Sequence, residues 1–322
     1  MGRYIVRRLV YMVVVLAVIT LLTFFIFYVM PPTDPALAFA GKQPTAETLA
    51  EVRRQFGLDQ PLYVQYGLFV KRLVLGDQYG WPGFGFSYQS RSSIRGVIFD
   101  RMGVTFQLAI GGAIAWLLIG IPIGVVSALK RRTRIDRAAM GFALFGVSAP
   151  VFWLGLMSLF IFWQKLGFSA LGTGYTPFTE SPGRWLGHMI LPWLVVAMLY
   201  AAFYARLVRG NMIEVMNEDY IRTARAKGLS ERDVIMKHGL RASLTPVVTL
   251  LGLDLGSLVG GAVVTESVFN LPGLGPYTIS AVFRGDLPVV LAVTVFAAFA
   301  ITFLSLIVDI AYAYLDPRVR YA

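Results

Sequence analysis

The sequence predicts an all-α membrane protein that crosses the bilayer several times, and both its composition and its pattern support this. Of its 322 residues, 57% are hydrophobic and only 15% are charged, whereas a typical soluble domain is about 45–50% apolar and about 25% charged. The apolar residues form runs long enough to cross a hydrocarbon core, which takes about 20 helical residues. No ten-residue alternating pattern of a membrane barrel is present, so the crossings are predicted to be helices. These features exclude a soluble globular protein and a large disordered segment.

Six apolar runs are predicted to be transmembrane helices, with both termini on the same side. The runs are Leu9–Met30, Val104–Leu129, Asp136–Trp163, His188–Arg209, Ser243–Thr265 and Pro288–Leu315. Pro122, Pro150 and Pro192 lie inside them, and such kinks are tolerated in a membrane bundle. The first run has 22 residues, which is longer than the apolar core of a signal peptide, about 7–15 residues. It is therefore predicted to remain as a membrane anchor.

The basic residues predict that both termini are cytoplasmic. The segments on the side of the termini hold 18 of the 29 Lys and Arg residues, and 8 of the other 11 lie in one long loop. Long loops count little toward the positive-inside rule. The chain thus divides into an N-terminal segment with the first helix (1–30), an external loop (31–103), a five-helix core (104–315) containing the cytoplasmic loop 206–242, and a cytoplasmic tail (316–322).

The external loop is predicted to form two short amphipathic helices. Thr48 and Glu51 have capping-box spacing, and Gly57 is a typical helix stop. Pro61 opens the second helix, which is predicted to end near Gly76. These helices lie on the outer membrane surface, form a contact surface for an extracytoplasmic partner, or do both. The glycine- and aromatic-rich stretch that follows is predicted to be irregular.

The cytoplasmic loop 206–242 carries the strongest local pattern. Asn217 is a favourable N-cap, two acidic residues follow it at the favourable end of the helix dipole, and Gly228 is a typical stop. A second amphipathic segment is predicted to begin near Ser230. The pattern predicts a short helix held off the membrane with a small apolar ridge on its exposed surface, formed by Tyr220, Ile221 and Ala224. The alternative is an amphipathic helix that lies on the bilayer.

The fifth apolar run combines a stripe of small residues with a carboxylate. Gly252, Gly256 and Gly260 recur every four residues, and such stripes let helix backbones approach closely. Asp254 lies on another face of the helix. A charged carboxylate at this depth costs at least about 2.5 kcal/mol and is a functional candidate. Asp254 either lines a transport pathway, where it would meet an ammonium or N–H group, or pairs with a basic or hydroxyl group on another helix.

The segment 266–275 is a candidate gate. It begins at Glu266, and its proline and glycines preclude a continuous helix. Phe269 and Leu271 could plug the outer mouth of a pathway. The alternative is a simple re-entrant turn.

At this point the sequence shows a clear resemblance. The cytoplasmic stretch Glu218–Leu229 closely resembles the coupling-loop signature of ABC importer permeases, specifically the oligopeptide/dipeptide permease family of the dipeptide permease B type. Arg222-Thr223-Ala224 takes the place of the signature's Glu-Ala-Ala, and Gly228 takes the place of its glycine. Other segments match in order along nearly the whole chain: Tyr4–Leu9, Gly57–Leu62, Thr265–Gly275 and Asp316–Arg320. The chain departs from the family at residues 78–87, where a shorter turn is usual.

The resemblance implies the permease fold of type I ABC importers and a place in the bacterial inner membrane. The chain would pair with a homologous second permease, two cytosolic ATPases and an extracytoplasmic solute-binding protein. The helix that docks on an ATPase would be formed by Glu218, Asp219, Tyr220, Ile221, Arg222, Thr223, Ala224, Arg225 and Gly228. ATP and Mg²⁺ would be bound by the ATPases, because this chain has no G-x-x-x-x-G-K-[ST] loop and is expected to hold no cofactor.

Other function classes have weaker support. The chain has two histidines and no cysteine, and it lacks the metal-binding and nucleophile motifs of membrane enzymes. An ion-coupled secondary transporter or a channel is an alternative, although such transporters usually carry more ionisable groups inside the membrane and an inverted repeat. A further alternative is an ABC permease for a nickel complex or glutathione.

Overall fold

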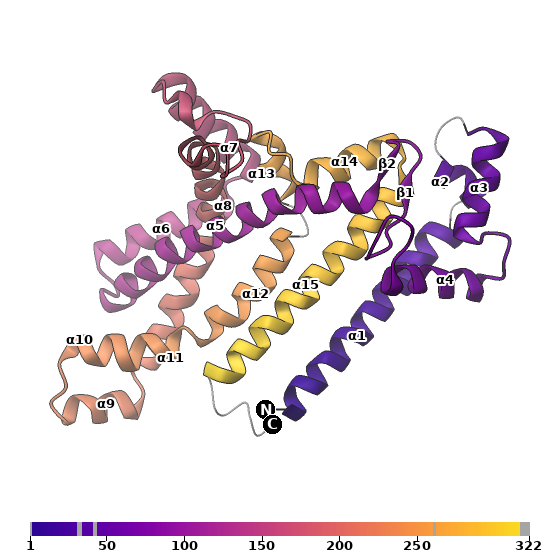
Figure 1. Cartoon of the computed structure of the whole chain (residues 1–322). Coiled ribbons are helices and arrows are strands. Elements are labelled where there is room, and N and C mark those ends of the chain that lie inside the picture. The colour runs from indigo at the N-terminus through magenta and orange to yellow at the C-terminus, as the bar shows by residue number, and fades with distance from the viewer. Residues whose placement is uncertain (1, 31–33, 41–43, 260–261, 316–322) are drawn as a thin grey trace.

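The computed structural model describes residues 2–30, 34–40, 44–259 and 262–315, and helices form most of it (Figure 1). The α-helices are α1 (Gly2–Phe24), α2 (Pro35–Ala40), α3 (Ala46–Phe56), α4 (Leu62–Leu75), α5 (Ile94–Leu129), α6 (Arg134–Ser148), α7 (Val151–Ser158), α8 (Pro182–Val215), α9 (Asp219–Ala226), α10 (Glu231–Asp233), α11 (Arg241–Ser243), α12 (Thr245–Val259), α13 (Val263–Val268), α14 (Leu274–Arg284) and α15 (Leu287–Leu315). The π-helical segments are η1 (Phe25–Val29), η2 (Leu159–Lys165) and η4 (Val234–Leu240), and η3 (Ser169–Leu171) is a 3₁₀ turn. Two short antiparallel strands, β1 (Phe86–Ser87) and β2 (Ser92–Ser93), complete the described elements.

The core is built around α5 and α8, which pack along each other over much of their length. Trp116 on α5 and Tyr204 on α8 are fully buried, and Trp116 stacks on Tyr200 with the ring centroids 4.5 Å apart. Helix α6 packs on α8, α12 packs on α15, and α1 packs on α15 (Figure 1). Pro122 and Pro192 lie inside continuous helices, as predicted for a membrane bundle.

The prediction of an all-α polytopic membrane protein is confirmed. Helix α1 with η1, and helices α5, α8 and α15, are each long and apolar enough to cross a membrane. Two further candidates are bent pairs: α6 with α7 and η2, at 103°, and the segment 231–243 with α12, at 45°. The predicted six crossings are reached if each bent pair counts as one crossing.

The third predicted crossing, Asp136–Trp163, is not one continuous helix. Ala149 has an extended backbone (φ −76°, ψ 128°), and α7 starts anew after Pro150. The residue before a proline is pushed out of the helical region by the proline ring, and the proline itself donates no hydrogen bond. The chain therefore turns sharply at this point, where the sequence predicted only a kink.

The two predicted helices of the external loop are present as α3 and α4. The N-cap of α3 lies three residues earlier than predicted: it is Thr45, whose Oγ1 accepts a hydrogen bond from the Thr48 N–H at 3.1 Å. The helix ends at Gly57, as predicted. Helix α4 follows Pro61 and ends at Gly76, as predicted.

A buried polar contact attaches the irregular part of this loop to the core. The Ser87 hydroxyl, on β1, donates to the Asp286 carboxylate at 2.5 Å, just before α15 begins. Burial raises the pKa of Asp286 above its ordinary value. The contact fixes the end of the loop 31–103, predicted to be external, against the start of α15.

The short helix α9 projects from one end of the bundle. In Figure 1 it lies at the lower left, toward the end where α1 begins, while β1, β2, α13 and α14 lie at the opposite end. Helix α8 runs from the region of α7 down to the loop that contains α9. The coupling-loop candidate and the gate candidate therefore lie at opposite ends of the core.

Candidate functional site

The predicted cytoplasmic helix is present as α9, but it starts later than its sequence pattern indicated. Glu218 is at the N-cap position and the helix begins at Asp219. Asn217 was predicted as the N-cap, and this was wrong: its Nδ2 donates to the Ile213 carbonyl at 2.8 Å, one turn back in α8. The side chain thus satisfies a carbonyl at the end of α8, where four carbonyls lack helical partners.

The predicted helix stop at Gly228 is confirmed. Gly228 has φ +76°, in the left-handed region that favours glycine. Its N–H donates to the Arg225 carbonyl at 2.9 Å, and the Leu229 N–H donates to the Ala224 carbonyl at 3.4 Å. These bonds satisfy carbonyls at the end of α9 and turn the chain back toward the core.

One side of α9 is seated on its own chain. Ile221 is fully buried and Ala224 is 6% exposed, and both pack with Val234, Val215 and Met216. Tyr220 is 45% exposed. The prediction that Ile221 and Ala224 form an exposed apolar ridge together with Tyr220 is therefore wrong. The helix uses its apolar face to attach to η4 and to the end of α8, and it presents a polar face outward.

The outward face of α9 consists mainly of exposed polar and charged side chains. Arg222 pairs with Asp219 at 3.2 Å, and the Thr223 hydroxyl donates to the Asp219 carbonyl at 2.9 Å. Arg225 makes a bidentate contact with Glu231, at 2.7 and 3.1 Å, across the turn at Gly228. This contact raises the pKa of Arg225 and ties α9 to α10. Ser230, where the second segment was predicted to begin, is the N-cap of α10.

The structure gives Asp254 a hydroxyl partner on another helix. Tyr204 Oη, on α8, donates to Asp254 Oδ2 at 2.6 Å. This is one of the two roles that the sequence left open. The pathway role stays a prediction, since Asp254 is only half-buried and part of its surface is open to a ligand.

The glycine stripe of α12 packs on α15. A Cβ at Gly252 would lie 2.5 Å from Val308, and a Cβ at Gly256 would lie 3.0 Å from the Ile301 backbone. Close helix packing at these two positions is what the stripe predicted. Gly260 lies outside the described residues.

Glu266 is buried at the centre of the candidate gate. Its carboxylate accepts hydrogen bonds from the Thr105 hydroxyl at 2.7 Å and from the Gly275 N–H at 2.8 Å. The Thr105 hydroxyl also accepts a bond from the Leu274 N–H at 3.0 Å. The carboxylate thus joins α13, α5 and the start of α14.

Phe269 and Leu271 point into the core in this conformation. Each is 1% exposed, and both belong to the main apolar cluster around α5 and α8. Together with Glu266 they define a compact, internally bonded turn. Their role as a gate stays a prediction.

Several partners in these contacts could not be found from sequence pattern. Thr105 contacts Glu266, Tyr204 contacts Asp254, and Arg209 contacts Asp136. In each pair the two residues come from helices that are far apart in the sequence. Periodicity identifies the face of a helix but not the neighbouring helix. The available signal was the presence of acidic residues in apolar runs, because such groups need a partner.

Comparison with known proteins assigns the family. The sequence model of the family described as "Binding-protein-dependent transport system inner membrane component" matches residues 120–321, and that of its N-terminal region matches residues 1–109. The chain is 37% identical to the dipeptide transport system permease protein DppB of Alkalihalophilus pseudofirmus, over 99% of each chain. It is 38% identical to the glutathione transport system permease protein GsiC of Escherichia coli K12, over 100% of each chain.

A solved structure supports the same fold. A chain from an inward-facing crystal form of the MetNI methionine ABC transporter superposes with a TM-score of 0.56 at 18% sequence identity. The match covers 69% of the present chain and 97% of that chain. The all-α bundle, the full-length relatives and the family match agree, and the chain belongs to the inner membrane permease components of bacterial binding-protein-dependent ABC transporters, within the peptide permease group.

Proposed function

We propose that this chain is one of two homologous permease subunits in an ATP-driven importer of di- and oligopeptides. It forms half of the translocation pathway and works by alternating access. Two cytosolic ATPases bind ATP and Mg²⁺, and an extracytoplasmic binding protein delivers the peptide. This chain supplies the pathway, the gate and the mechanical link to the ATPases.

The observation that carries the proposal is the attachment of α9. Its buried face, Ile221 and Ala224, packs on η4 and on the end of α8, while its charged face is exposed. An exposed helix that is anchored in this way can transmit the rigid-body movement of a bound partner to the bundle. The outward face offers Asp219, Arg222 and Arg225 for polar contacts with an ATPase surface.

The exposed face of α12 supports a pathway role for Asp254. Thr249, Leu253 and Ser257 are exposed along this helix, and Asp254 lies among them. A carboxylate is costly against lipid and suits a hydrated passage shared with a second permease. The Asp254 carboxylate would accept hydrogen bonds from the ammonium or backbone N–H groups of a peptide.

The names of the relatives support a peptide substrate. One relative is named for dipeptide transport and another for glutathione transport, and glutathione is itself a short peptide. The charge distribution supports placing both termini and α9 in the cytoplasm. The external loop, with α3 and α4, then faces the compartment of the binding protein.

The proposal is tested by reconstituting the purified complex in liposomes with ATP inside and the binding protein with labelled peptides outside. We expect uptake that requires ATP, the ATPases and the binding protein. Uptake driven by an ion gradient without ATPases would instead support a secondary transporter. ATP-driven uptake of nickel chelates with no uptake of peptides would overturn the proposed substrate class.

A further inference from the structure

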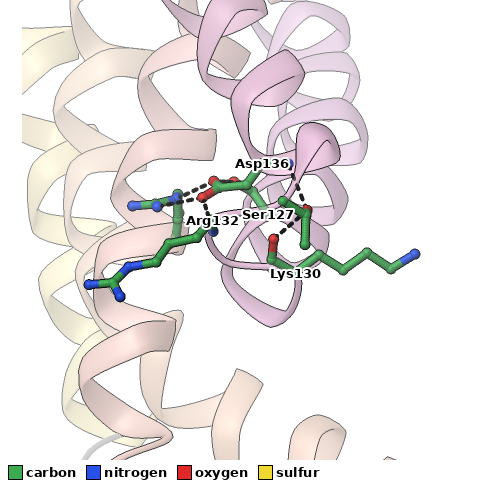
Figure 2. Close-up of polar contacts among 6 residues, drawn as sticks. Ser127, Lys130, Arg132 and Asp136 are labelled. Carbon is green, nitrogen blue, oxygen red and sulfur yellow. Dashed lines mark hydrogen bonds and ion pairs between the residues drawn. The ribbon is translucent and has the colours of Figure 1, made fainter.

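A buried carboxylate ties three helices together near the base of α9. Asp136, in the first turn of α6, accepts hydrogen bonds on both of its oxygens (Figure 2). Arg209, on α8, donates from Nε at 2.7 Å and from Nη2 at 2.9 Å. The Ser127 hydroxyl, on α5, donates at 2.5 Å, and the Arg132 N–H donates at 2.8 Å.

The geometry is specific to these two side chains. The Asp136 side chain is 6% exposed and that of Arg209 is 26% exposed. Arginine presents two parallel N–H groups that match both carboxylate oxygens, which a lysine ammonium cannot do. Arg132 has φ +63°, a left-handed conformation that is uncommon for a residue other than glycine. The bond from its N–H to Asp136 holds the α5–α6 turn in this conformation.

The pair lies between α9 and the rest of the core. Arg209 is six residues before Val215, the last residue of α8, which corresponds to about 9 Å along the helix. Val215 and Met216 form the seat of Ile221 and Ala224.

The segment η4, which also carries Val234 of this seat, packs on the same end of α8: a Cβ at Gly239 would lie 3.0 Å from Met212. A force on α9 therefore reaches this end of α8 both directly and through η4, and Asp136 attaches this end to α5 and α6.

Farther into the core, α8 is held to α5 by close backbone packing. A Cβ at Gly124 would lie 2.6 Å from the Ala205 carbonyl oxygen. Beyond this contact, toward α9, α5 ends at Leu129 and the chain turns into α6. The Asp136–Arg209 pair thus holds α8 to α5 and α6 at a position closer to α9 than the Gly124 contact.

We propose that Asp136 and Arg209 are positioning residues for coupling: they lock the base of α9 to α5 and α6, so that α5, α6, α8 and α9 move as one body. The inference rests on the function proposed above, in which α9 contacts an ATPase. Without the pair, the end of α8 bends under load, and ATP is hydrolysed with less transport.

The first test measures peptide transported per ATP hydrolysed in the reconstituted complex. The variants are Asp136→Asn and Arg209→Lys, and the control is Arg184→Lys, which alters an exposed ion pair at the other end of the same helix. We expect the transport-to-ATP ratio to fall about fivefold or more in both variants, the lower end of typical coupling between sites. The control should leave the ratio unchanged.

The second test distinguishes a positioning role from general stability. The chain has no cysteine, so Arg232→Cys and Leu144→Cys can carry spin labels on the coupling loop and on α6. With Asp136 and Arg209 in place, we expect a narrow distribution of distances between the two labels, and ATP should not broaden it. When Asp136→Asn or Arg209→Lys is added, we expect ATP to broaden this distribution.

The outcomes separate the two proposals. If the unaltered complex imports peptide but Arg209→Lys, assembled in normal amounts, keeps both the ratio and the narrow distribution, the locking role is overturned. If the complex with Asp136→Asn does not assemble, the results for Arg209→Lys decide whether the pair has the locking role. If the unaltered complex shows no ATP-dependent import, the proposed function fails, while the label distances still report whether the pair holds α6 to the loop.

Discussion

Two carboxylates inside the bundle, Asp254 and Glu266, each have a hydrogen-bond partner on a different helix. Asp254 is paired with Tyr204, and Glu266 is paired with Thr105. A buried polar group without a partner costs free energy, so these pairs stabilise the arrangement of helices. Whether a pair also serves transport can be decided by altering each partner separately.

For Asp254 we expect the carboxylate to matter more than its bond to tyrosine. Asp254→Asn should lower peptide uptake several-fold while the complex still assembles, because the neutral amide attracts an ammonium group more weakly than a carboxylate does. Tyr204→Phe removes only the hydroxyl and should lower uptake less. Uptake assays alongside subunit stoichiometry check this prediction. Unchanged uptake by Asp254→Asn would exclude the pathway role. An equal loss of uptake in both variants would show that the Tyr204–Asp254 hydrogen bond has a structural role instead.

Both hydrogen bonds to Glu266 use its carboxylate oxygens as acceptors. In Glu266→Gln the amide NH₂ would either oppose the Gly275 N–H or donate to the Thr105 oxygen, and in the second case the Thr105 hydroxyl hydrogen loses its acceptor. We expect lower thermal stability, by about 1–3 kcal/mol for an unsatisfied buried group. Glu180→Gln, at an exposed ion pair, is the control. Equal melting temperatures for both variants would contradict the buried role of Glu266.

At the scale of single elements, α9 depends on how it ends and on what it sits against. Gly228 turns the chain at φ +76°, and proline, fixed near φ −65°, cannot adopt that conformation. We expect Gly228→Pro to uncouple ATP hydrolysis from transport without blocking membrane insertion. Gly141→Ala, on α6, where nothing lies within 4 Å of an added methyl group, is the control. Normal transport per ATP in Gly228→Pro would contradict the role of this turn.

The seat of α9 offers a second variant for the same measurement. Ala224 is buried against η4 and the end of α8, so Ala224→Glu would place a charge in an apolar contact and detach the helix. The expected result is again hydrolysis with little transport. Ala242→Glu, at an exposed alanine on α11 outside the docking helix, adds the same charge away from the seat and is the control.

At the scale of the whole molecule, α12 and α15 are held together by backbone approach at glycines. Gly256→Leu would force the helices apart, because even a Cβ would lie 3.0 Å from the Ile301 backbone. Overpacking of this kind costs about 1–3 kcal/mol. We expect a lower melting temperature in detergent than for Gly103→Leu, at an open position on α5. The reverse order would contradict close α12–α15 packing.

The sequence predicted the elements better than their contacts. The apolar runs located the long helices, and Gly57, Gly76 and Gly228 located helix ends, because these signals act within a few residues. Asn217 and Ile221 were misassigned, because Asn217 contacts α8 and Ile221 contacts η4 and the end of α8 rather than solvent. Only the folded chain shows these neighbours. For the same reason the break at Pro150 looked like a kink: local sequence does not show whether neighbouring helices support a continuous path.

The most direct test of the account is the contact between α9 and an ATPase. Ala226→Cys, at an exposed position on a cysteine-free background, can carry a short photo-crosslinker in the assembled complex in membranes. We expect a crosslink to the ATPase subunit, whose yield changes when ATP is added. Crosslinks to lipid alone, in a complex that contains the ATPases, would contradict the account.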